Sequence, residues 1–178
     1  YTALVENILD HPNIELRLKA RWEDQTERFD HVFYSGPLDR WFGCDIGRLG
    51  YRTLDFEAER AVGDFQGCAV MNHPDPETPF TRISEHKWFS PWEAAEHEKT
   101  IVFREYSRFC GPEDVPYYPI RLVDEKKLLA QYEERAAQVE GVTFVGRLGT
   151  YQYLDMDVTI GRALDAAQAF LARRRPAA

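Results

Sequence analysis

Hydrophobic and polar residues follow several distinct patterns along this chain, and each pattern predicts an element. Residues 1–9 carry apolar side chains at helical spacing, which predicts a helix. Residues 14–22 alternate between apolar and charged side chains, which predicts a half-buried strand because strand side chains point to opposite faces in turn. Residues 31–34 are a short apolar run that predicts another strand, ending at the Ser-Gly-Pro turn at 35–37.

The middle of the chain predicts an antiparallel sheet. After a loop or short helix at 37–49, four candidate strands are joined by turns rich in Pro, Asp and Gly, which is typical of antiparallel connections. The segments 90–99 and 111–119 are predicted to be exposed connections. The four candidate strands are residues 51–59, 67–72, 79–89 and 100–109.

Two helices are predicted in the last third of the chain. Residues 126–140 place their apolar side chains on one helical face, and Gly141 is a helix stop. A final helix is predicted from Met156 to Arg173, with Asp155 as its N-cap.

A strand and a glycine turn are predicted between these helices. Residues 142–145 are apolar and rich in β-branched side chains, which indicates a buried strand. Gly146 and Gly149 then bracket Arg147, so the backbone can turn tightly and present one guanidinium at the end of the strand. With the following helix start, this segment offers N–H donors and a positive dipole end to an anionic group.

Composition limits the class of function. The 178 residues are 44% hydrophobic, enough for one core or pieces of two, and no apolar run approaches the roughly 20 residues of a membrane span. A net charge of −8 argues against a general nucleic-acid binder. Cys44, Cys68 and Cys110 are scattered, which fits a reducing cytoplasm, and neither they nor the histidines have metal-ligand spacing.

Ordered motifs resemble a known family. The sequence GRLGTYQYLDM, residues 146–156, resembles the C-terminal signature of UDP-galactopyranose mutase, a flavoenzyme that interconverts the pyranose and furanose forms of UDP-galactose. The family's flavin-binding fingerprint, G-x-G-x-x-G, occurs nowhere in the 178-residue sequence. The chain is therefore expected to be the C-terminal part of a mutase. The other motifs, in the family's order, are YSGPLDRWFG, GYRTLDFE, GCAVMNHPD, PFTRISEHKWF, REYSRF and PYYPI.

The resemblance implies an α/β fold in two parts. An antiparallel mixed sheet is expected to form the substrate domain, and a strand with helices is expected to complete an FAD-binding Rossmann-like domain. Residues 37–141 are assigned to the sheet domain, and residues 1–36 and 142–178 to the FAD-binding domain.

The resemblance also implies substrate contacts. Arg82, in the predicted strand 79–89, matches the family arginine that holds the substrate diphosphate, and Tyr118 and Tyr153 match two tyrosines that hydrogen-bond the same group. Asn72 matches a family asparagine on the substrate. The residues alone leave other interpretations open, namely an exposed strand arginine, aromatic core residues and a turn asparagine.

The flavin contacts implied by the resemblance lie further along the chain. Arg147 matches an arginine on the cofactor, and the residues that follow surround the flavin ring. Asp155 is equally well explained as an N-cap. Arg52 and Glu105 lie in family motifs and are second-rank candidates, whereas Tyr117 and Tyr151 are expected in the core in preference to their neighbours Tyr118 and Tyr153. The residues expected around the ring are Leu154, Asp155, Met156, Asp157, Val158 and Thr159.

The expected activity is a flavin-dependent isomerisation of UDP-galactose. The resemblance implies that N5 of reduced FAD, rather than a protein side chain, attacks the sugar, so no catalytic side chain and no metal ligand is assigned. The family context allows a homodimer. The 178-residue polypeptide alone is expected to bind FAD weakly and to be inactive, because it lacks the glycine-rich pyrophosphate turn. The alternatives are a non-catalytic nucleotide-sugar-binding module and a purely structural domain.

Overall fold

The protein is described by a computed structural model covering residues 1–120 and 125–174. The chain divides into two compact units, Tyr1–Asp30 and His31–Ala178, and each unit is described by itself. The predicted assignment of residues 1–36 and 142–178 to one domain remains a prediction, and its last four residues lie outside the described residues. In the part of the chain that the structure covers, no helix is long and apolar enough to cross a membrane.

The first unit confirms the predicted helix and corrects the predicted strand. Helix α1 covers Thr2–Leu9. The alternating segment 14–22 forms no strand, and Leu18 is 77% exposed. A strand needs a partner for its N–H and C=O groups, and the described residues 1–30 contain no strand with which this segment could pair. Arg17 instead bridges Glu15 and Glu27, with N–O distances of 2.6 Å to each, and the segment ends in the 3₁₀ turn η1, Trp22–Asp24.

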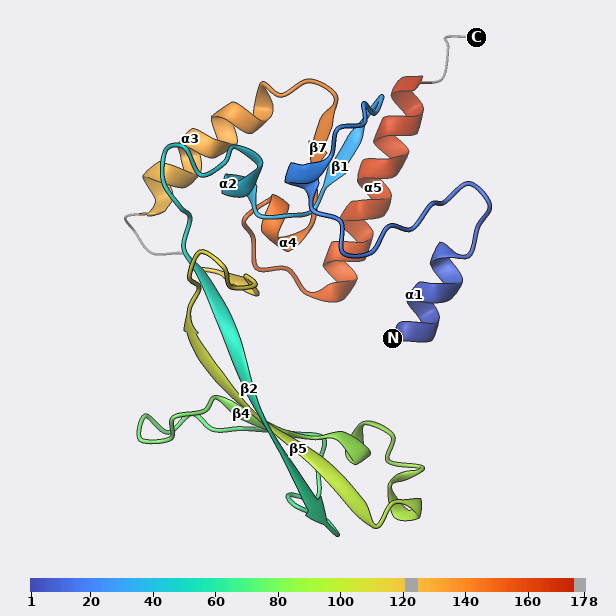
Figure 1. Cartoon of the computed structure of the whole chain (residues 1–178), viewed down its shortest axis with the longest axis vertical. Helices are drawn as coiled ribbons and strands as arrows, with labels where there is room; N and C mark the ends of the chain where they lie inside the picture. Colours follow the sequence, from blue (N-terminus) through green and yellow to red (C-terminus); the bar gives the residue numbers. More distant parts are fainter. Residues whose placement is uncertain (121–124, 175–178) are drawn as a thin grey trace. The chain divides into compact units, whose positions relative to one another are not determined.

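A parallel pair of strands forms one part of the second unit. Strand β1, Val32–Tyr34, lies beside β7, Val142–Phe144, although the two are far apart in the sequence (Figure 1). Helix α5, Met156–Arg174, packs against β1, because the Phe170 ring lies 5.4 Å from the Phe33 ring. The predicted strands at 31–34 and 142–145 are confirmed.

The hydrophobic core of this unit is built from aromatic and leucine side chains. Helix α2, Leu38–Trp41, and helix α3, Glu125–Ala137, both contribute to it. The predicted helix at 126–140 is confirmed, although it ends at Ala137, three residues earlier than predicted. Gly141 has a positive φ of 72° and leads into β7. The buried residues of this core are Leu38, Leu49, Tyr51, Tyr132 and Tyr151.

The second sheet has five antiparallel strands in the order β3-β4-β5-β2-β6. Its two long members are β2, Tyr51–Val62, and β5, Lys99–Phe109, which form the twisted ribbon in Figure 1. The predicted antiparallel sheet is therefore confirmed, although the two-residue edge strand β6 was expected to be loop. The shorter strands are β3, Val70–Asn72, β4, Arg82–Glu85, and β6, Tyr118–Pro119.

The predicted strand 79–89 is only partly correct. Pairing between β4 and β5 ends at Glu85 and Val102, and a 3₁₀ turn, η2 (His86–Phe89), follows. The His86 ring instead packs on Phe103 at 4.8 Å. Regular alternation of side chains therefore stops at Glu85, although the His86 ring still contacts Phe103, which lies on the same side of the sheet as Arg82.

The register gives this sheet two chemically different faces, because directly paired residues point to the same side. Face B carries ion pairs between strands, with N–O distances of 2.7 Å for Arg108 and Asp55 and 2.8 Å for Arg104 and Glu59. Face A is defined by the residues Arg52, Leu54, Phe56, Asn72, Arg82, Ser84, Phe103, Glu105, Ser107, Phe109 and Tyr118.

A buried carboxylate on face B holds the loop before β3. Glu85 is fully buried, and its oxygens accept hydrogen bonds from the main-chain N–H groups of Phe65 (3.0 Å), Gln66 (2.8 Å) and Gly67 (3.1 Å). Burial by itself would raise the pKa of Glu85, but the N–H donors stabilise the ionised form and leave the pKa lowered. One ionised side chain of β4 thus bonds three consecutive main-chain N–H groups of this loop.

Candidate functional site

Three predicted substrate residues lie on face A of the sheet. Asn72 pairs with Arg82 across β3 and β4, and Arg82 pairs with Glu105 across β4 and β5. Tyr118 pairs with Arg52 across β6 and β2. Since every step of this register keeps a side chain on the same face, all of these residues, including the second-rank candidates Arg52 and Glu105, share one surface.

The Arg82 side chain is available for a ligand. It is 42% exposed and forms a long ion pair with Glu105, whose Oε1 lies 3.8 Å from Nε, beyond hydrogen-bond range. Glu105 accepts a hydrogen bond from the Thr81 hydroxyl instead. Within residues 1–120 and 125–174 the buried Nε of Arg82 has no hydrogen-bond partner, and no hydrogen bond to a protein group occupies the exposed part of the side chain, which therefore can donate to an anion.

Tyr118 and Tyr153 form a second group together with Arg147. Their rings stack with centroids 5.8 Å apart, and the Arg147 guanidinium lies 5.1 Å from the Tyr118 ring and 4.7 Å from the Tyr153 ring. Arg147 also donates from Nε and a terminal nitrogen to the Leu154 carbonyl, at 3.2 and 2.5 Å. Arg147 therefore contacts Leu154, which is predicted to lie at the cofactor, and both predicted substrate tyrosines.

The structure separates Arg82 from this tyrosine group along the sheet. Three strand spacings, about 14 Å, lie between β4 and β6, and four residues of β2, about 13 Å, lie between the partners of Arg82 and Tyr118. A single ligand group can touch both only if the two long side chains extend toward each other above face A. The site is therefore an extended surface.

The predicted glycine turn is a short helix, α4, Gly146–Gly149. Gly146 has a positive φ of 73°, which glycine tolerates better than other residues. At Gly149 a Cβ atom would lie 2.6 Å from the Tyr34 carbonyl oxygen, so only glycine allows α4 to approach β1 this closely. These two glycines fix the position from which Arg147 extends.

The residues predicted around the flavin ring lie at the start of α5. The Asp155 carbonyl accepts hydrogen bonds from both the N–H and the hydroxyl of Thr159, at 2.9 Å, which puts Asp155 at the N-cap position of the helix. Met156 and Val158 are exposed in the first turn, beside the 61% exposed Tyr153. Leu154 differs from its neighbours, because its side chain is buried and its carbonyl is bonded by Arg147.

Two aromatic residues test the core predictions. Tyr151 is 1% exposed, as expected for a core residue, whereas Tyr117 is 38% exposed and was wrongly expected in the core. Tyr117 lies just before the edge strand β6, which has no further strand on its outer side to cover it. No group of three or more potential metal ligands occurs in the described part of the chain.

Residue contacts that sequence patterns did not indicate also shape face A. Arg52 donates from Nε to the Ser107 hydroxyl at 3.0 Å and lies 4.9 Å over the exposed Phe109 ring. The pairing of β2 with β5 brings Arg52 to Ser107 and Phe109, which are more than 50 residues away in the chain. No local sequence signal predicts this contact.

Comparisons with known proteins agree with the motifs. Residues 1–153 match the family model described as UDP-galactopyranose mutase. A probable UDP-galactopyranose mutase of Klebsiella pneumoniae is 54% identical, and a dTDP-fucopyranose mutase of Escherichia coli is 45% identical, each over 96% of this chain. A UDP-galactopyranose mutase of Mycoplasma pneumoniae is 36% identical. The chain spans 44%, 47% and 46% of the lengths of these relatives.

Proposed function

The chain belongs to the UDP-galactopyranose mutase family, and from this premise we propose that the protein interconverts UDP-galactopyranose and UDP-galactofuranose. The substrate is UDP-galactose and the reaction is an isomerisation with no net oxidation or reduction. The observation that carries the proposal is the Arg82 side chain on face A, whose buried Nε has no hydrogen-bond partner among the described residues. A partly exposed guanidinium with free donors suits a diphosphate, because its forked N–H groups match two phosphate oxygens.

The tyrosine pair adds neutral donors to this arrangement. The hydroxyls of Tyr118 and Tyr153 extend the site without adding charge, so they steady a departing diphosphate without holding it too tightly for recombination. Arg147 over both rings keeps positive charge beside the pair. Asn72, next to Arg82 across the sheet, supplies an amide that donates and accepts hydrogen bonds to sugar hydroxyls.

We propose that FAD in its reduced form is the cofactor and that the β1–β7 pair with α5 belongs to a Rossmann-like FAD-binding domain. The exposed apolar side chains at the start of α5 fit a flat ring, and the first-turn N–H groups favour negative charge there. The flavin supplies the nucleophile for the sugar's anomeric carbon when it is bound. The residues proposed around it are Arg147 and 154–159, which fit the ring rather than the pyrophosphate of FAD.

The proposal is tested with UDP-galactose on the flavin-loaded, reduced protein at the full length of its mutase relatives, because the 178 residues alone are expected to be inactive. Formation of UDP-galactofuranose is expected, and the oxidised protein is expected to be inactive. The relative named dTDP-fucopyranose mutase makes dTDP-fucose the comparison substrate, because it differs in both the base and the sugar. UDP binding without any conversion would instead indicate a non-catalytic nucleotide-sugar-binding module.

Replacing Tyr153 by phenylalanine is expected to weaken the enzyme mildly. The change removes one neutral hydrogen bond to the diphosphate, worth about 0.5–1.5 kcal/mol, and keeps the ring stack on Tyr118. Steady-state kinetics should show a loss in kcat/KM of roughly three- to tenfold. Tyr117→Phe, at the exposed neighbouring ring, is the control and should behave as wild type. A loss of a hundredfold or more in Tyr153→Phe would require a further role for this hydroxyl.

A further inference from the structure

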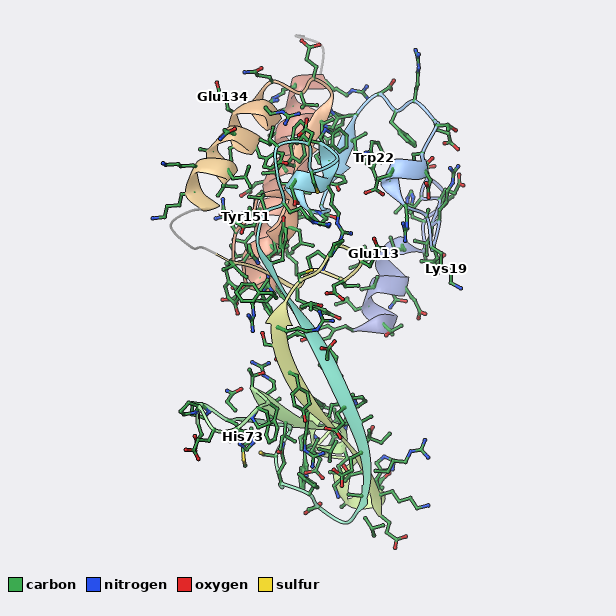
Figure 2. The ribbon with its side chains drawn as sticks, turned by 60° about the vertical axis from the view of Figure 1, so that its left-hand side comes forward. Lys19, Trp22, His73, Glu113, Glu134 and Tyr151 are labelled. Atoms are coloured by element: carbon green, nitrogen blue, oxygen red, sulfur yellow. The ribbon has the colours of Figure 1, made fainter. Side chains whose placement is uncertain are left out.

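Tyr151, labelled in Figure 2, combines unusual burial, backbone conformation and hydrogen bonding. Its side chain is almost fully buried, and its φ of +49° is in the left-handed region that residues other than glycine rarely adopt. Its hydroxyl oxygen lies 2.6 Å from two main-chain carbonyl oxygens, those of Gly50 and Ile120. A strained backbone that aims a phenol at two carbonyls indicates a specific constraint.

The two carbonyls lie at the end of the pairing between β2 and β6. The Ile120 N–H donates to the same Gly50 carbonyl at 2.9 Å, and Tyr51 pairs with Pro119 in the next register position. Strand β6 has only two residues, and one of them is a proline without an N–H to donate. The edge strand therefore has few hydrogen bonds of its own, and the Tyr151 hydroxyl adds one at its end.

This contact joins the two chain segments that carry the stacked tyrosines. Tyr118 precedes Ile120 by two positions, and Tyr153 follows Tyr151 by two positions. A single hydroxyl thus connects the backbone close to both rings, whose centroids are 5.8 Å apart. The Tyr151 ring also packs edge-on against Tyr51 at 5.3 Å, so the phenol has a fixed direction.

We propose that Tyr151 is a positioning residue, whose hydroxyl holds β6 and the segment before α5 together and so fixes the Tyr118–Tyr153 pair. The consequence for turnover depends on the proposed mutase function. The hydroxyl has one proton and two acceptors, so it alternates between the Gly50 and Ile120 carbonyls or is shared by them. Phenylalanine at this position fills the same volume but leaves both carbonyls without this donor.

The test compares Tyr151→Phe, Tyr153→Phe and the double variant in the reduced, flavin-loaded protein. Tyr151→Phe is expected to lower kcat/KM for UDP-galactose about tenfold, as for the loss of one buried hydrogen bond. The double variant is expected to lose much less activity than the product of the two single losses, because both changes act on the same pair. Flavin content is expected to be unchanged. Losses that multiply would overturn the proposal.

Tyr132→Phe is the matched control. Tyr132 is also fully buried, in the same core, and its hydroxyl donates to a main-chain carbonyl, that of Gly47, at 2.6 Å. Among the described residues the Tyr132 hydroxyl bonds Gly47 and neither of the two segments that carry the stacked rings, so kcat/KM of Tyr132→Phe should stay near wild type even if stability falls equally. An equal loss of activity in Tyr132→Phe would show that core stability, rather than positioning, explains Tyr151.

A structural measurement separates this inference from the proposed function. Crystal structures of Tyr151→Phe and Tyr132→Phe are expected to show the Tyr118 and Tyr153 rings displaced in the first and unmoved in the second. That outcome supports the positioning role even if the wild-type protein converts no UDP-galactose, in which case only the proposed function fails. Unmoved rings in Tyr151→Phe would overturn the positioning role even in an active mutase.

Discussion

Arg82→Ala is expected to lower turnover of UDP-galactose at least about a hundredfold while leaving bound flavin nearly unchanged. The guanidinium makes no hydrogen bond within the part of the sheet that the structure describes, so its donors are free for the diphosphate. Loss of one charge-assisted contact to a group that gains negative charge costs roughly 3 kcal/mol at the transition state. The measurement is kcat in a flavin-saturated assay, with flavin content determined from the absorbance spectrum.

Arg60→Ala is the control for this prediction. Arg60 belongs to β2 and points to the same face as Arg82, but it is exposed and lies four residues beyond Phe56, on the side away from Tyr118. Removing its charge changes the general field above the sheet without removing a proposed diphosphate contact. Near-normal turnover in Arg82→Ala, or equal losses in both variants, would contradict the assigned role of Arg82.

Glu85→Gln is expected to destabilise the protein by about 2 kcal/mol at pH 7, because hydrogen bonds to a charged acceptor are stronger than those to a neutral one. The glutamine amide would also direct an NH₂ group at one of the three N–H donors now bonded by the carboxylate. The folded protein lowers the pKa of Glu85. The stabilisation is therefore complete above the unfolded-state pKa of about 4.3 and is lost as the pH falls through the lower folded-state pKa.

Urea unfolding at several pH values measures this effect. The difference in the free energy of unfolding between wild type and Glu85→Gln should be constant from about pH 7 to 5 and should shrink below about pH 4. Glu59→Gln serves as the control, because Glu59 is an exposed carboxylate that pairs with Arg104 on the same face. Its effect should be small, as for other surface ion pairs. A pH-independent difference in Glu85→Gln would mean that packing, not charge, explains the loss.

Sequence patterns predicted the elements whose side chains meet a partner. The turns rich in Pro, Asp and Gly around 51–59 and 100–109 correctly indicated β2 and β5, which pair with each other along almost their whole length. The alternation of apolar and charged residues in 14–22 misled, since no strand within residues 1–30 is available to pair with that segment. Periodicity thus reports that a segment could be a strand, and a partner elsewhere in the chain decides whether it becomes one.

The residues of the candidate site were predicted from motif resemblance, but their arrangement in space could not be predicted from the sequence. Nothing in the spacing of Asn72, Arg82 and Tyr118 reveals that they share a face, because that depends on the register of four separate strand pairings. The stacking of Tyr118 on Tyr153 likewise depends on contacts between distant segments. Tyr151 was predicted only as a core residue, since local sequence does not show where a buried hydroxyl points.

The parallel pairing of β1 with β7 has a consequence for how the chain folds. Val32 pairs with Val142, so this contact closes a loop of about 110 residues, at an entropic cost of about 4 kcal/mol if that loop were still unfolded. The five-stranded sheet lies entirely within the loop and is built mainly from pairings between nearer segments. If that sheet forms first, it shortens the effective distance between β1 and β7 and acts as an internal cross-link. The surface that carries Arg82 then also serves as a folding scaffold for the parallel pair.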